Sequence, residues 1–167
     1  EWLERKFNII DTPGDLDFIS EALGALRVVD FAMITIDAQS GIEVGTEQVW
    51  EFAESYKLPK FIVVNGYDKE NTDFDSLLEQ LRERFGNKVF PLAIPINPGP
   101  GFNKVLDVMR SDIVTYKTDQ SGKYSEEKAS GEWAERVKEL HRELIEHVAE
   151  ADDTLLDLYP MIRGEQM

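Results

Sequence analysis

One stretch of the sequence predicts the type of fold, and it runs Phe7-Asn8-Ile9-Ile10-Asp11-Thr12-Pro13-Gly14-Asp15-Leu16-Asp17-Phe18. An apolar run ends at Asp11, turns at Pro13-Gly14 and continues into a segment with helical spacing. In an α/β protein, a strand that ends this way delivers a carboxylate to the sheet edge where ligands bind. The Gly14 amide and the start of the next helix favour an anion, whereas Asp11 favours a cation. The same residues also suit an ordinary strand-turn-helix corner, so both interpretations stay open at this point.

The composition is that of a globular protein with an acidic surface. The chain has 167 residues, of which 42% are hydrophobic, enough for one domain and a small additional subdomain. Lys and Arg number 18 against 33 Asp and Glu, and the net charge of −15 disfavours DNA or RNA binding and favours a basic protein partner. Cysteine is absent, which excludes disulfides and thiolate metal sites and fits a reducing compartment, so we expect a cytoplasmic protein.

Targeting and membrane signals are missing from the sequence. No apolar run approaches the roughly 18 residues of a membrane-spanning helix, so we expect no membrane partner. Residues 1–6 do not resemble a signal peptide, and the chain does not begin with Met. We therefore expect the sequence to be a piece of a longer chain.

Apolar strands and amphipathic helices alternate in the first part of the chain. The expected elements are a strand at 7–10, a helix at 17–28, a strand at 31–36, a helix at 46–56 and a strand at 60–64. The uninterrupted apolar run at 31–36 predicts a strand buried on both faces, and Thr46 is a plausible helix cap. The fold class predicted is α/β, an incomplete, doubly wound and mostly parallel sheet, with residues 1–70 as a partial nucleotide-binding domain.

The pattern changes after residue 70, and residues 71–167 are expected to form an appended α/β subdomain. A helix at 73–85 should end at Gly86-Asn87, and Pro91 and Pro95 make 89–96 an edge or irregular strand. The remaining expectations are short strands at 105–108 and 113–116, a flexible connection at 119–130, a long amphipathic helix at 133–151 and one more helical turn at 155–158.

Complementary chemistry is expected where two of the strands end. Asp11 suits Mg²⁺ held through water, and the Gly14 amide suits a terminal phosphate. Asn65-Gly66-Tyr67-Asp68 follows the strand at 60–64. The Asp68 carboxylate can accept two hydrogen bonds from a guanine edge, while the Asn65 amide locks the loop or contacts the base. A tight turn at Asn65-Gly66 is the structural alternative.

The Asp-Thr-Pro-Gly and Asn-x-x-Asp motifs at this separation resemble the GTPase domain of translation elongation factor G and its relatives. Residues 37–43 and 46–50 resemble that family's intervening segments, and 92–159 resembles its inserted subdomain. The resemblance implies a P-loop GTPase fold that binds GTP or GDP with Mg²⁺ and hydrolyses GTP on the ribosome in protein synthesis. It also implies the ribosomal stalk protein as a possible partner. The nucleotide-binding residues that it implies are Asp11 (also the metal ligand), Thr12, Pro13, Gly14, Asn65 and Asp68.

Three departures from the family pattern point to a divergent paralogue. No Gly-x-x-x-x-Gly-Lys-Ser/Thr phosphate-binding motif occurs, so we expect it upstream in a longer parent chain and expect these 167 residues alone to bind nucleotide weakly. Asp15 stands where the family usually has a water-orienting His, which makes it the candidate catalytic residue. Gly66 replaces the usual Lys, whose side chain packs over the base.

Two alternatives to a GTP hydrolase remain. Asp15 and Gly66 also suit a ribosome- or protein-binding module that no longer hydrolyses nucleotide. Acidic residues at strand ends are also typical of phosphoacceptor receiver domains, with Asp11 or Asp37 as the acceptor. The long segment after Asp68 has no place in so compact a fold, which disfavours this second alternative.

Overall fold

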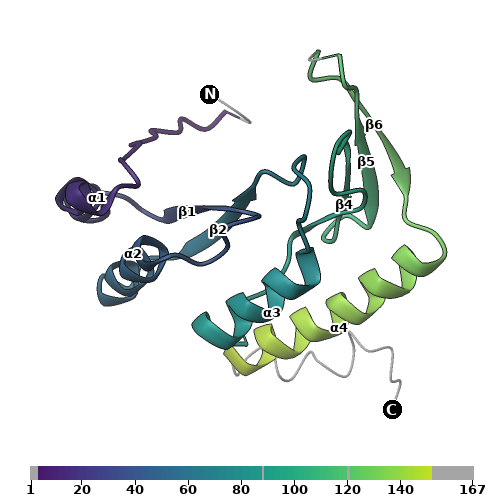
Figure 1. The fold of residues 1–167 in the computed structure, drawn as a ribbon. Coiled ribbons are helices and arrows are strands. Elements are labelled where there is room, and N and C mark those ends of the chain that lie inside the picture. The colour runs from purple at the N-terminus through teal and green to yellow at the C-terminus, as the bar shows by residue number, and fades with distance from the viewer. Residues whose placement is uncertain (1–3, 88, 120, 152–167) are drawn as a thin grey trace. The chain divides into compact units, whose positions relative to one another are not determined.

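The structure is a computed structural model that describes residues 4–87, 89–119 and 121–151 (Figure 1). The chain divides into two compact units, Glu1–Gly66 and Tyr67–Met167, and each is considered by itself. No helix within the described ranges is long and apolar enough to cross a membrane.

The first unit contains a parallel β-α-β arrangement. Strands β1 (Ala32–Asp37) and β2 (Lys60–Asn65) pair in parallel, with Asp37 opposite Asn65 at the carboxyl end. A short 3-10 helix, η1 (Leu16–Phe18), leads into α1 (Ile19–Leu26), and α2 (Val44–Ser55) connects the two strands. The core joins both helices to the sheet through Leu26, Ala32 and Ala53. The predicted parallel sheet and both predicted helices are confirmed.

Residues 7–10 form no strand, so that prediction is wrong. They have no regular secondary structure, and Ile9 is 83% exposed. A strand needs a hydrogen-bonded neighbour, and within the described residues β1 and β2 pair only with each other. An apolar run signals a tendency to extend, but the neighbouring strand decides whether a ladder forms.

Burial of β1 also differs from the prediction, because only one of its faces is covered. Ile34 is 5% exposed, whereas its neighbour Met33, on the opposite face, is 54% exposed. Phe61 of β2 lies on the exposed side and stacks on Phe31 at 5.5 Å between ring centroids. The core residues contributed by α1 and α2 cover the other face alone.

The start of α2 lies two residues before the predicted start. Glu43 is the N-cap residue, and its backbone N–H donates to Thr46 Oγ1 at 3.3 Å. Thr46 therefore serves the helix start from inside the first turn, not as the cap itself. Glu43 and Thr46 form a capping box, in which Glu is the N-cap and Thr follows three residues later. The usual order is Ser or Thr at the N-cap and Glu or Gln three residues later.

The second unit is an antiparallel sheet with two helices. The strands lie in the order β3-β4-β5-β6. Their bounds are β3 Ala93–Pro95, β4 Lys104–Asp107, β5 Asp112–Tyr116 and β6 Tyr124–Lys128, and the helices are α3 Phe74–Phe85 and α4 Glu132–Ala151. The core cluster joins strands to α4 and consists of Ile94, Leu106, Val108, Ile113, Val137 and Leu140. Figure 1 shows α3 and α4 side by side, and ion pairs between Arg82 and Glu143 and between Arg136 and Asp75 link them.

Several predictions for this unit are confirmed. Helix α3 ends at Gly86, whose φ of +100° suits glycine, and β3 is an edge strand next to β4. The strands expected at 105–108 and 113–116 correspond to β4 and β5, and the long helix corresponds to α4. The helical turn expected at 155–158 lies outside the described residues.

The flexible connection predicted at 119–130 is wrong, because these residues contain β6. This strand pairs with β5 along its length, with Tyr124 opposite Tyr116. Its side chains are all exposed, which explains why the sequence has no apolar signal there. Lys128 Nζ lies 2.7 Å from Asp112 Oδ1, and Arg110 donates two hydrogen bonds to Glu126 at 2.8 and 3.0 Å. Backbone pairing and these ion pairs hold the strand in place of a hydrophobic face.

Candidate nucleotide-binding site

The carboxyl edge of the parallel sheet brings Asp37 and Asn65 together. They are register partners, and the Ala38 N–H donates to the Asn65 carbonyl oxygen at 2.8 Å. Asp37 Oδ1 accepts hydrogen bonds from the backbone N–H groups of Gln39 at 2.9 Å and Ser40 at 3.3 Å. Asp37 thus shapes the loop after β1, which is a structural role and gives no support to a phosphoacceptor there.

The turn that contains Gly14 lies against the start of α2. A Cβ atom on Gly45, the second residue of α2, would lie 3.7 Å from the Gly14 carbonyl oxygen and 3.5 Å from Leu16 Cδ2. Because α2 begins just beyond the carboxyl end of β1, the turn lies near the same edge as Asp37 and Asn65. Asp11, Pro13 and Gly14 are exposed, and a ligand has access to them.

The predicted metal ligand Asp11 provides a single exposed carboxylate. Within the described ranges, no group of three or more His, Asp or Glu side chains lies close enough to hold a metal by itself. Mg²⁺ needs no such group when it binds together with a nucleotide, because phosphate oxygens and waters supply most of its six ligands. The residues present therefore fit a Mg²⁺ ion that arrives with its nucleotide, and do not form a separate protein cage.

Asp15, the candidate catalytic residue, is the N-cap of η1. Its Oδ1 accepts a hydrogen bond from the Asp17 N–H at 3.0 Å, and the residue is exposed. Sequence reasoning missed this capping role, although an Asp just before a helical segment is a typical N-cap signal. One carboxylate oxygen of Asp15 is therefore engaged in local structure.

The loop after β2 is shaped by its Asn-Gly pair. Asn65 Oδ1 accepts a hydrogen bond from the Gly66 N–H at 2.9 Å, and Gly66 has a φ of +88°. A side chain at this left-handed position would cost about 1–2 kcal/mol. The glycine found in place of the family's Lys is therefore suited to the backbone of this loop.

Asp68 belongs to the second unit and is exposed, whereas its neighbour Tyr67 is only 7% exposed. The Tyr67 ring packs against Phe74 and Phe102, with centroid distances of 6.3 and 6.2 Å. Its carbonyl oxygen accepts a hydrogen bond from the Gly99 N–H at 2.7 Å. Sequence reasoning did not single out Tyr67. The available signal for a buried anchor was an aromatic residue between the polar loop residues Gly66 and Asp68.

Burial raises the pKa of Tyr67 to about 12, and the nearby carboxylates of Asp73 and Asp75 act in the same direction. The folded protein thus favours the neutral phenol more than the unfolded chain does. The stability that follows from this preference is fully present below the unfolded-state pKa of Tyr67, which is near 10. We expect about 2 kcal/mol of stability to be lost as the pH rises from about 10 to about 12.

The variant Tyr67→Phe tests this expectation. At pH 7 it should be as stable as the original chain or more stable by up to about 1 kcal/mol, because the buried Tyr67 hydroxyl has no hydrogen-bond partner among the described residues. Urea unfolding at pH 8 and pH 11.5 is the measurement. A variant that loses as much stability between these pH values as the original chain would contradict the assignment to Tyr67.

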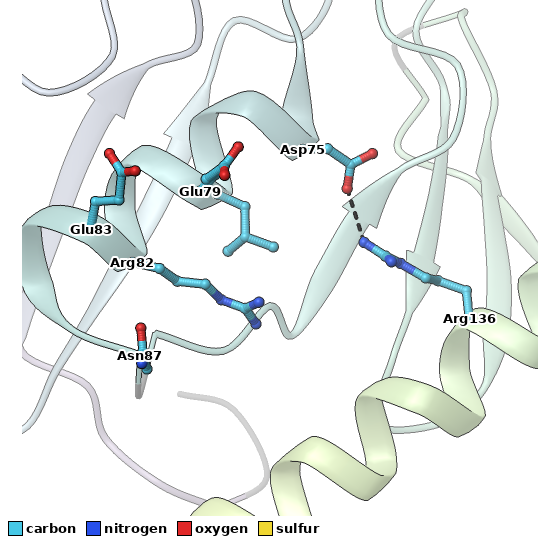
Figure 2. A pocket seen from close by; sticks show the side chains of 7 residues that line it. Asp75, Glu79, Arg82, Glu83, Asn87 and Arg136 are labelled. Carbon is cyan, nitrogen blue, oxygen red and sulfur yellow. Dashed lines mark hydrogen bonds and ion pairs between the residues drawn. The ribbon is translucent and has the colours of Figure 1, made fainter.

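A shallow pocket of about 450 Å³ lies beside α3 in the second unit (Figure 2). Figure 2 shows the Asp75–Arg136 ion pair at its margin, with a distance of 2.9 Å. Arg82 in the same pocket pairs with Glu143 and donates to the Val89 carbonyl oxygen at 3.1 Å. None of the predicted nucleotide-binding residues lines the pocket, and these ion pairs serve the packing of α3 against α4.

A parallel β-α-β unit with polar loops at the carboxyl ends of its strands defines an α/β protein of the nucleotide-binding class. The chain belongs to the family of the elongation factor Tu GTP binding domain, whose sequence profile matches residues 1–161. This confirms the predicted fold class and the predicted relationship to elongation factor G-like GTPases.

Among solved structures, the chain is similar to the crystal structure of a protein from Thermus thermophilus that is designated ttk003000868. The TM-score is 0.80 and the sequence identity is 34%. The match covers 93% of this chain and 23% of that chain, so this chain spans less than a quarter of the length of that relative. Membership in the family implies a guanine nucleotide as the ligand class.

Proposed function

We propose that this chain is part of a translational GTPase of the elongation factor G type, which binds GTP and hydrolyses it in a reaction coupled to the ribosome. The observation that carries the proposal is the family match over residues 1–161. In this proposal residues 1–70 are a partial GTP-binding domain and residues 71–167 an inserted subdomain. The ribosome, its stalk protein and a cytoplasmic location belong to the same proposal.

Each predicted site residue has a role in this proposal. Asp11 binds Mg²⁺ through water, and the Gly14 N–H donates to the terminal phosphate in a turn that Thr12 and Pro13 shape. Mg²⁺, when bound, neutralises the charge that develops on the phosphates. The exposure of Asp11 and Gly14 and the position of the turn beside α2 support these roles.

Guanine recognition is assigned to the Asn65–Asp68 loop. The Asp68 carboxylate accepts hydrogen bonds from the two N–H groups of the guanine edge. Asn65 holds the loop through its hydrogen bond to Gly66, which leaves its amide NH₂ as a donor. Asp15 orients the attacking water through the carboxylate oxygen opposite the one that caps η1.

Nucleotide binding by the longer polypeptide that contains this sequence is the first test. Calorimetry with Mg²⁺ should give micromolar or tighter binding of GTP and GDP and binding of ATP weaker by at least about 100-fold. The 167-residue chain alone should bind GTP weakly or not at all, and submicromolar binding by it would contradict our assignment of phosphate contacts to other segments. Equal affinity for ATP and GTP in the longer polypeptide would refute guanine recognition.

A second candidate function is a ribosome- or protein-binding module without hydrolysis. The observation that favours it is Asp15, whose carboxylate caps η1 and puts a negative charge next to the turn that our proposal assigns to the phosphates. Ribosome-stimulated GTP turnover, measured in the longer polypeptide and in its Asp15→His variant, separates the two. Turnover in the original protein supports the GTPase. Turnover that arises only in the variant supports the module.

A further inference from the structure

Tyr67 is a buried residue in an exposed loop. Asp68, the next residue, is exposed, while Tyr67 is 7% exposed. Its ring completes an aromatic cluster with Phe74, the first residue of α3, and Phe102, which precedes β4. Phe74 in turn packs against the core of the antiparallel unit, so the cluster of Tyr67, Phe74 and Phe102 is continuous with that core.

The backbone of Tyr67 is held by the segment that precedes β4. The Gly99 N–H donates to its carbonyl oxygen at 2.7 Å, and the Phe102 N–H donates to the Gly99 carbonyl oxygen at 2.9 Å. Asn97 braces this segment, because its Oδ1 accepts from the Lys104 N–H at 2.8 Å and its Nδ2 donates to the Gly101 carbonyl oxygen at 3.2 Å. The segment that binds the Tyr67 backbone is therefore an ordered loop that leads into β4.

The position of Asp68 follows from these contacts. Consecutive Cα atoms are about 3.8 Å apart across a trans peptide, so a residue whose neighbour is fixed has little freedom of position. The Tyr67 hydroxyl has no hydrogen-bond partner among the described residues, which means that the ring and the carbonyl group provide the anchoring. A change in the packing of the antiparallel unit would move Tyr67 and Asp68 together.

We propose that Tyr67 is a positioning residue that ties the guanine-reading carboxylate of Asp68 to the antiparallel unit, so that the packing of the cluster of Tyr67, Phe74 and Phe102 sets the selectivity for guanine. This inference rests on the proposed function, because it takes Asp68 as the guanine contact. It adds a means by which a partner bound to the antiparallel unit can change nucleotide affinity without touching the nucleotide.

A comparison of GDP with IDP, which lacks the guanine 2-amino group, measures how well Asp68 is positioned. In the longer polypeptide we expect GDP to bind about 10- to 100-fold more tightly than IDP, the effect of a hydrogen bond to a charged group. Tyr67→Leu should reduce this ratio to about threefold or less, because GDP loses both hydrogen bonds to Asp68, whereas IDP, which keeps only the ring N–H of the two, loses one and is weakened less. Phe102→Leu, a milder change in the same cluster, should reduce the ratio in the same direction.

Two control variants separate positioning from general loss of stability. Tyr67→Phe keeps the ring and should keep the original ratio. Phe90→Leu removes an aromatic ring that packs against the core outside the cluster, and should also keep it. A Tyr67→Leu protein that is folded by circular dichroism and keeps the original ratio would overturn the proposal.

A measurement without nucleotide distinguishes failure of this inference from failure of the proposed function. Hydrogen exchange at the Gly99 N–H of the 167-residue chain should be faster in Tyr67→Leu and Phe102→Leu than in Tyr67→Phe, because the acceptor carbonyl becomes mobile. Unchanged exchange would overturn the anchoring. If exchange responds as expected but the original protein does not discriminate GDP from IDP, then the guanine role of Asp68 is wrong, and the proposal falls with it.

Discussion

Replacement of Leu106 by alanine is expected to lower the free energy of unfolding of the antiparallel unit by about 3 kcal/mol. Leu106 of β4 has an exposed fraction of 0% and lies in the core cluster with Ile113 of β5 and Leu140 of α4. Removal of its branched side chain loses the transfer free energy of the buried carbons and leaves a cavity between the sheet and α4.

The measurement is urea unfolding monitored by amide hydrogen exchange in β4 and β5, which reports on the antiparallel unit alone. Leu92→Ala is the matched control, because Leu92 in the same unit is 56% exposed and should change stability by less than about 0.5 kcal/mol. A loss below about 1 kcal/mol for Leu106→Ala would mean that this core is not packed as described.

Replacement of Asp68 by asparagine is expected to weaken GDP binding by the longer polypeptide by about 100-fold. In the proposed guanine contact the carboxylate accepts from both N–H groups of the guanine edge, whereas the asparagine amide presents its own NH₂ donors to one of them. An unpaired donor facing a donor costs more than the simple loss of a hydrogen bond, because both groups stay desolvated.

The control for this substitution is Glu127→Gln, which removes the same charge from an exposed position on β6. It should leave GDP affinity within about twofold, since Glu127 has no assigned contact with the nucleotide and an exposed charge is screened at physiological salt. Calorimetric titration with GDP is the measurement. Equal weakening by both substitutions would show that overall charge, not recognition by Asp68, controls binding.

Local pattern was sufficient for the elements whose stabilising partners are close in sequence. The apolar spacing of α3, its Asp73 cap and its terminal Gly86 are all local signals, and the structure has each of them. The parallel pairing of β1 with β2 also followed from the pattern, because a strand, a crossing helix and a second strand favour that topology. The family resemblance came from short motifs, which the match over residues 1–161 confirms.

Other features depended on partners that the local pattern does not name. Residues 7–10 have the apolar character of a strand and form none, because strand formation requires a neighbour with free hydrogen-bonding groups. Strand β6 has the polar character of a loop and is a strand, because β5 supplies that neighbour and Asp112 and Glu126 supply ion pairs.

The sequence by itself determined the helices, the parallel pairing and the relationship to the GTPase family. Only the tertiary structure decided which apolar faces are covered, that β6 is a strand, and that Tyr67 packs in the antiparallel unit next to Asp68. The physical reason is that periodicity and capping act over a few neighbouring residues, whereas burial and strand pairing depend on contacts between residues distant in the chain.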